Sequence, residues 1–155
     1  MKNEPVAAVP AARMIELSRK QCLELLALVP FGRVGFTRRA LPVIRPVNHL
    51  VDGDTIVIRT HPGSALARHT TVDEIVVYEA DDLDARTRTG WSVMVTGRAG
   101  PVTAPWEAAR YRALLIPWTD RDVDDIVRIQ AELVTGYRLT RSPALSSPHL
   151  QAAGL

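Results

Sequence analysis

Several residue types and patterns are scarce in this sequence of 155 residues, and each scarcity excludes a class of protein. Cys22 is the only cysteine, which excludes an intramolecular disulfide and a cysteine-rich metal cluster. No apolar run approaches the roughly 18 residues that a membrane-spanning helix needs, and the N-terminus lacks the basic start and apolar core of a signal peptide. We therefore expect a cytoplasmic protein without a membrane partner.

Aromatic residues make up 5% of the chain, and the basic residues are 17 arginines and two lysines scattered along it, for a net charge of +2. Neither a basic stripe nor a helix-turn-helix pattern is present, so we expect no nucleic-acid partner. The GxSxG, Walker, GxGxxG and HExxH motifs are also missing. We interpret His49, His61, His69 and His149 as surface or loop residues because their spacing is not that of metal ligands, and we expect no metal site.

The length and the hydrophobic content of 46% predict one domain with a substantial core. Residues 1–14 are rich in proline and alanine and predict a flexible arm. Residues 142–155 are rich in serine, proline and alanine and predict a flexible tail. The folded domain is therefore expected to span residues 15–141.

Two helices are predicted. Ser18 and Gln21 have the spacing of a capping box, Leu17 and Cys22 that of a hydrophobic staple, and Pro30 ends the first helix. The second helix begins with Pro105 and runs to about Leu115. The residues that we expect on its inward face are Trp106, Ala109, Ala113 and Leu114.

Most of the remaining chain reads as β-strands, at residues 33–37, 42–51, 55–60, 73–80 and 91–103. Asp52-Gly53 is a dipeptide that tight hairpins prefer. Asp81, Asp82 and Asp84 are expected in a solvated loop that reaches Gly90, and Gly97 and Gly100 suggest bulges. The pattern of residues 123–139 fits a helix stripe or two strands.

The most informative stretch is residues 41–67, in which two strands lead into the loop His61-Pro62-Gly63-Ser64 and a short helix-like segment. The N–H groups of a helix start suit a phosphate. The runs GRVGF, PVIRPVNHLVDGDTIVIRT, PGSALA and TGWSVMVTGRAGPV, in this order, resemble the pyridoxamine 5'-phosphate oxidase-like family of flavin-binding split β-barrels over residues 17–139. The resemblance implies a mainly β (α+β) split barrel with a few short flanking helices, and strands at residues 126–130 and 134–140.

The resemblance also implies a homodimer with a flavin, FMN, at the subunit interface. The implied ring contacts are Arg45, Pro46, Val47 and Asn48; the implied contacts of the phosphate tail are Arg59, Thr60, Ser64 and Ala65; and the implied contribution of the second subunit lies near Trp91 and Ser92. Each residue also has a purely structural interpretation: Pro46 and Val47 as edge and core residues, Arg45 as a solvated charge, Trp91 as barrel packing.

One departure from the family pattern is Ala65, where members commonly carry a basic residue. Loss of a charge-assisted bond to phosphate costs roughly 1.5–3 kcal/mol. The function implied is flavin-mediated hydride or electron transfer on an undetermined small molecule, with no side chain assigned as acid or base. A deazaflavin cofactor and a non-catalytic binding module are the alternatives. Vitamin B6 oxidation is not expected, because Tyr137-Arg138-Leu139 only faintly resembles the oxidase's basic C-terminal ending.

Overall fold

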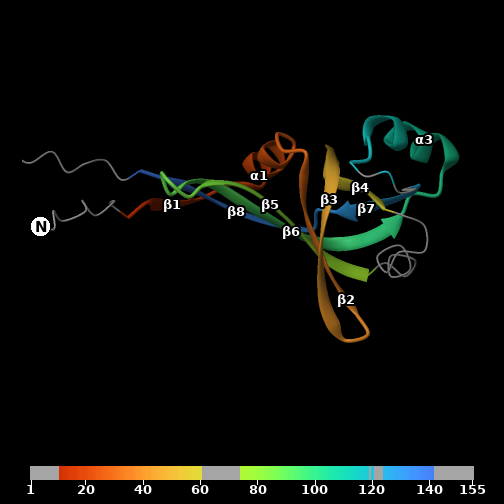
Figure 1. Ribbon diagram of the computed structural model, residues 1–155, viewed down its shortest axis with the longest axis horizontal. Helices are drawn as coiled ribbons and strands as arrows, with labels where there is room; N and C mark the ends of the chain where they lie inside the picture. Colours follow the sequence, from red (N-terminus) through yellow and green to blue (C-terminus); the bar gives the residue numbers. More distant parts are fainter. Residues whose placement is uncertain (1–10, 61–73, 119, 121–123, 142–155) are drawn as a thin grey trace, which may run out of the picture.

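The structure is a computed structural model, and it describes residues 11–60, 74–118, 120 and 124–141. Its strands and helices are, in chain order, β1 (Arg13–Glu16), α1 (Arg19–Leu26), β2 (Phe31–Arg38), β3 (Leu41–Asp52), β4 (Thr55–Thr60), β5 (Glu74–Asp84), β6 (Thr89–Pro101), α3 (Pro105–Leu114), β7 (Asp125–Gln130) and β8 (Leu133–Thr140) (Figure 1). Neither helix in these described ranges is long and apolar enough to cross a membrane.

The strands form one sheet in the order β1-β8-β6-β5-β2-β3-β4-β7, and an additional pairing of β6 with β7 closes it. The closed ring therefore consists of β6, β5, β2, β3, β4 and β7, while β8 and β1 continue the sheet from β6 beneath α1 (Figure 1). The mainly β fold with a barrel and short flanking helices is confirmed. The two strands chosen for residues 123–139 are also confirmed, as β7 and β8.

The first helix begins as predicted. The Ser18 side chain accepts from the Gln21 N–H, and the Gln21 side chain accepts from the Ser18 N–H, which completes the capping box. Leu17 and Cys22 both lie in the main core, at the positions of a hydrophobic staple. Burial raises the pKa of the Cys22 thiol, so this cysteine is a neutral core residue.

Gly97 marks the point where β6 changes partner. Up to Thr96 the strand pairs with β8, and from Ala99 it pairs with β7. A Cβ on Gly97 would lie 1.6 Å from the Gln130 carbonyl oxygen, because the link from β7 to β8 crosses directly over this residue. The ladder between β5 and β6 runs through Gly97 without a bulge, so the interruption that we expected in β6 lies in the opposite strand pair.

The structure corrects the predicted inward face of α3. Trp106, Ala109, Ala113 and Leu114 are all exposed, Trp106 by 71%. The buried residues are Ala108, Tyr111 and Leu115, which pack with Val57 and Ile126. The sequence is apolar on both sides of this helix, so its pattern alone does not identify the side that the sheet covers.

The prediction that the three aspartates lie in a solvated loop is also wrong. Asp81, Asp82 and Asp84 lie on β5, whose pairing with β6 continues to Asp84–Thr89. The turn follows Asp84, whose Oδ1 accepts from the N–H groups of Arg86 and Thr87. At the N-terminal end, β1 pairs with β8 from Arg13 onward, two residues inside the segment that we expected as an arm.

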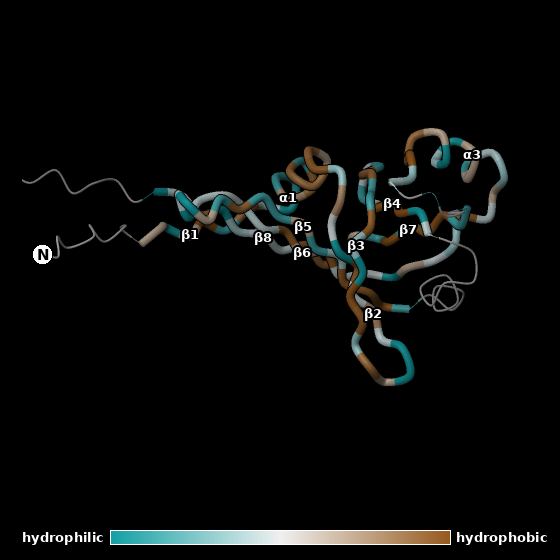
Figure 2. The backbone as a smooth tube through the Cα atoms, viewed as in Figure 1, coloured by the Kyte–Doolittle hydropathy of each residue, from teal (hydrophilic) through white to brown (hydrophobic). Residues whose placement is uncertain are grey.

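Antiparallel pairing gives the barrel an inner and an outer face. Residues that pair across strands share a face, and the inner face together with α1 forms the main core, which includes Val34, Ile58, Tyr78 and Val93. The outer face of β3, β4 and β7 is covered by α3 through the second cluster. Figure 2 shows apolar stretches of β3, β4 and β7 converging in the region where the barrel closes.

Candidate functional site

The outer edge of β3 is the most distinctive main-chain feature of the barrel. β3 pairs with β2 along Leu41–Asn48, but its pairing with β4 covers only His49–Asp52. In the described ranges, no strand pairs with the other edge of residues 41–48. A strand edge of this kind presents a row of N–H and C=O groups to whatever lies beside it.

The direction of these groups follows from the hydrogen bond that joins the start of β2 to β3. The His49 N–H donates to the Pro30 C=O at 3.1 Å, so the main-chain N–H and C=O of His49 point toward β2. Main-chain groups alternate in direction along an antiparallel strand. Those of Val47 therefore point toward β2, and those of Asn48 and Pro46 point away from it. The N–H of Asn48 and the C=O of Pro46 therefore face the side of β3 that lies away from β2.

Two prolines fit this geometry. Pro42 and Pro46 both occupy positions whose main chain faces away from β2, opposite Thr37 and Arg33. A proline has no N–H, so within a sheet it is tolerated at an edge. The prolines keep this edge short of donors and leave Asn48 as the donor nearest the point where β3 and β4 separate.

The four residues predicted to contact the ring fall on both faces of β3. Pro46 and Asn48 lie on the outer face, whereas Arg45 and Val47 pair with Val34 and Gly32 and lie on the inner-face side. The Arg45 guanidinium donates to the Ile44 C=O at 3.1 Å and is exposed. Val47 packs against the main core. Ring contact by these side chains stays a prediction.

Asn48 and Arg59 meet at the C-terminal end of α3. The Asn48 amide donates to the Ile116 C=O at 2.9 Å. The Arg59 guanidinium donates to the C=O groups of Arg112 and Leu115 at 3.1 and 3.0 Å. A cation at this end of a helix satisfies carbonyls that lack intrahelical partners and complements the helix dipole. Two predicted site residues therefore position the end of α3.

The four residues predicted to contact the phosphate tail do not form one group among the described residues. Arg59 also lies 3.4 Å from Asp124, and only 13% of its side chain is exposed. Thr60 is buried and, by alternation, points to the face opposite Arg59. Ser64 and Ala65 lie outside the described residues. Phosphate binding by this set stays a prediction, and any phosphate at Arg59 shares the guanidinium with α3.

Trp91 and Ser92 also face opposite ways. Trp91 is 6% exposed and packs in the main core, as its structural interpretation expects. Ser92 lies on the outer face, opposite Asp81 and Tyr137. Its strand is separated from β3 by β5 and β2, which places Ser92 about 14 Å from Asn48 along the sheet.

The interpretation of His49 as a surface or loop residue is wrong. It is 6% exposed, its Nε2 lies 2.8 Å from the Leu26 C=O, and its Nδ1 lies 2.6 Å from the Tyr78 hydroxyl. A carbonyl only accepts, so Nε2 carries the hydrogen and Nδ1 accepts from Tyr78. Burial lowers the pKa of His49 and raises that of Tyr78, which keeps both neutral. Because both ring nitrogens are occupied, His49 joins α1, β3 and β5.

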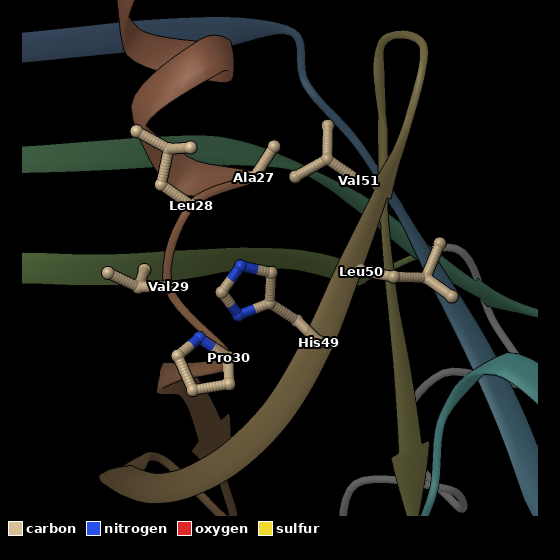
Figure 3. Close-up of a pocket in the computed structure, with 7 residues that line it drawn as sticks. All are labelled: Ala27, Leu28, Val29, Pro30, His49, Leu50 and Val51. Carbon is tan, nitrogen blue, oxygen red and sulfur yellow. The ribbon is translucent and has the colours of Figure 1, made fainter.

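A shallow groove of about 310 Å³ lies beside this histidine, lined by residues 27–30 and 49–51. Figure 3 shows the His49 ring between β3 and the end of α1, while Leu50 points to the opposite side of the strand. The groove is bounded mainly by aliphatic side chains, and the imidazole has no spare nitrogen for a ligand. We assign it no chemistry.

An ion cluster lies on the outer face of β2 and β5. Arg33 contacts Glu79 at 3.1 Å and Asp81 at 3.5 Å. Desolvation raises the pKa of Glu79, the adjacent Asp81 raises it further, and Arg33 partly offsets both. Among the described residues no group of three or more histidines, cysteines or carboxylates has the arrangement of a metal site.

Comparison with known proteins places the chain in a family. The family model described as pyridoxamine 5'-phosphate oxidase matches residues 18–140. The chain belongs to the pyridoxamine 5'-phosphate oxidase family. The uncharacterised protein Rv0080 of Mycobacterium tuberculosis is 49% identical over 133 residues, which are 83% of this chain and 88% of that protein.

Two solved structures of relatives have the same fold. The FAD-binding protein of Mycobacterium smegmatis is 34% identical with a TM-score of 0.66, over 81% of this chain and 97% of that one. A candidate pyridoxamine 5'-phosphate oxidase of Corynebacterium glutamicum is 31% identical with a TM-score of 0.70, over 84% of this chain and 96% of that one. The resemblance of the four sequence runs to this family is confirmed.

Proposed function

We propose that this protein binds a flavin at the outer edge of β3 and uses it for hydride or electron transfer on a small molecule. The observation that carries the proposal is the main-chain edge at Pro46–Asn48, which no described strand covers. Family membership and the FAD-binding relative at 34% identity support it. The flavin, when bound, supplies the redox chemistry, and the protein supplies position and shielding.

The edge fits the polar side of a flavin ring. That side carries carbonyl and N–H groups, which need donors and acceptors at alternating places. Asn48 offers an N–H and Pro46 offers a C=O, both directed away from β2. Because these groups belong to the backbone, they hold a ring without a particular side chain, which explains why no catalytic motif is present.

The choice among flavins depends on the tail. FMN remains our proposal, with Arg59, Thr60, Ser64 and Ala65 near its phosphate. FAD has support from the relative whose structure is that of an FAD-binding protein. A deazaflavin shares the same tricyclic ring shape and is the third candidate, favoured by the neutral Ala65. All three place their ring at the same strand edge.

We also propose that the protein is a homodimer. Large apolar residues are exposed on the outer faces of β2, β5, β6 and β8, where a second copy of the chain would cover them. They are Phe31, Ile75, Leu83, Met94, Leu133 and Tyr137. Ser92 lies on the same face, three strands from Asn48, and a second copy of the chain would bring its own Ser92 to the ring, as the family resemblance implies.

Ligand titration of the purified protein tests the proposal. FMN, FAD and a deazaflavin are added separately while the melting temperature is recorded. Saturation at 100 times Kd adds about 2.7 kcal/mol to the free energy of unfolding. An unchanged melting temperature with all three at millimolar concentration contradicts flavin binding and favours the non-catalytic module.

Two substitutions then locate the ring. Asn48→Ala keeps the main-chain N–H and removes the side chain, whereas Asn48→Pro also removes the N–H that faces the unpaired edge. We expect Asn48→Pro to bind about tenfold more weakly than Asn48→Ala, since an acceptor on the ligand loses its donor. Equal affinities of the two variants would place the ring elsewhere.

A further inference from the structure

Three exposed apolar side chains gather where α3 ends. Ile116 is 71% exposed, Trp118 is 64% exposed and Phe31 is 42% exposed. The Phe31 and Trp118 rings lie with their centroids 5.4 Å apart at 60°, an edge-to-face pair.

This pair lies on the outer face of the sheet beside Asn48. Phe31 is the register partner of Asn48, on the same outer face, and a pair that shares no main-chain hydrogen bonds brings its Cα atoms to about 4.5 Å. Trp118 follows Ile116, whose carbonyl is bound by the Asn48 amide. The aromatic pair therefore lies over the outer face next to Asn48, whose main-chain N–H is proposed to hold the flavin ring from the edge of β3.

Three hydrogen bonds fix the segment that carries Trp118. The Asn48 amide binds the Ile116 C=O at 2.9 Å, and Arg59 binds the C=O groups of Leu115 and Arg112 at 3.0 and 3.1 Å. Leu115 itself is buried against the outer face of the sheet. The backbone before Trp118 is thereby anchored on one side by β3 and on the other by β4.

We propose that Phe31 and Trp118 form an aromatic contact for the tricyclic ring of the flavin, which makes them binding residues beyond those that the family resemblance implies. This inference rests on the proposed function, because the ring is the planar group held at the adjoining strand edge. Edge and face contacts between aromatic groups are favourable for every flavin. The contact therefore serves FMN, FAD and a deazaflavin alike and does not select among their tails.

Asn48 and Arg59 acquire a second role in this arrangement. They are positioning residues for the aromatic pair, because they bind the carbonyls that set the path of residues 112–116. The buried Trp91 is separate from this group, since it packs in the main core on the inner face.

The test uses lumiflavin, which has the ring without a tail, beside FMN and FAD. Trp118→Ala is compared with Trp106→Ala, a matched control that removes a 71% exposed tryptophan from the start of α3. Trp118→Phe keeps an aromatic ring. We expect Trp118→Ala to weaken all three ligands by about the same factor, roughly tenfold. Trp106→Ala should bind as the wild type does, and Trp118→Phe should recover most of the affinity.

The other outcomes overturn the inference. If Trp118→Ala binds the ligands as tightly as the wild type does, the aromatic pair does not contact the flavin ring, and the proposed function still stands. Weakening of FAD alone assigns the pair to the adenine instead of the tricyclic ring. A dimer that dissociates in Trp118→Ala, measured by sedimentation without ligand, makes the pair a contact between copies. A wild-type protein that binds none of the three ligands overturns the proposed function as well.

Discussion

The hydrogen bond between Tyr78 and His49 is predicted to stabilise the fold strongly. Tyr78→Phe removes only the hydroxyl, which donates to His49 Nδ1 at 2.6 Å. Tyr78 is fully buried and His49 is 6% exposed, so in Tyr78→Phe water has little access to His49 Nδ1, which has lost its donor. The Leu26 carbonyl keeps the hydrogen on Nε2, which prevents the imidazole from changing tautomer to compensate.

The cost follows from this geometry. A buried acceptor left without a donor costs about 1–3 kcal/mol. For a protein of this length, each kcal/mol lowers the melting temperature by about 2–4 °C. We therefore expect Tyr78→Phe to melt about 2–12 °C below the wild type, and to lose the same free energy in urea unfolding without a change in the slope.

Tyr137→Phe is the matched control, because it makes the same chemical change on a side chain that is 44% exposed. Substitutions of that kind usually stay within about 0.5 kcal/mol. If Tyr78→Phe and Tyr137→Phe were equally stable, the buried chain of hydrogen bonds from Tyr78 to Leu26 would contribute nothing, and the role given to His49 would be refuted.

Three further predictions concern stability, each measured by urea unfolding. Burial lowers the pKa of His49 below its usual 6.5, so as pH falls through 6.5 the unfolded chain takes up the proton first; stability should fall by up to about 1.4 kcal/mol per pH unit, and His49→Gln should abolish that part of the slope. Gly97→Ala should cost at least about 3 kcal/mol, since its Cβ would meet the Gln130 carbonyl at 1.6 Å, whereas a loss below 1 kcal/mol would contradict the crossing. Ser18→Ala should cost about 1 kcal/mol through loss of the cap, and no loss would show that the Gln21 half suffices.

The strands and the barrel could be predicted largely because local signals agree with the fold. Asp52 ends β3 and pairs with Thr55, so the hairpin loop is Gly53-Asp54; Gly53 has a φ of 60°, and the register of the two strands follows from this turn. Residues 123–139 were ambiguous in pattern and were resolved by resemblance to a family. The glycine in the middle of β6 was visible, but the crossing strand that requires it, around Gln130, lies far away in sequence.

The candidate site could be predicted only in part, because alternation separates neighbours in sequence. Arg59 and Thr60 are adjacent in the chain yet face opposite sides of the barrel, as do Trp91 and Ser92. No local pattern shows that α3 packs outside the barrel, or that the Asn48 and Arg59 side chains bind carbonyl groups at its C-terminal end. His49 did have a signal, since it falls in phase with the inward Val47 and Val51, but its partner Tyr78 is 29 residues away.

The exchange rate of the Asn48 amide hydrogen, measured with and without saturating FMN, tests the central claim most directly. The His49 N–H, bound to the Pro30 carbonyl, is the internal control and should stay protected in both states. We expect FMN to slow hydrogen exchange at the Asn48 amide at least about tenfold and to leave exchange at the His49 amide unchanged. Bound FMN that leaves the Asn48 amide as exchangeable as before would contradict a flavin held at the outer edge of β3.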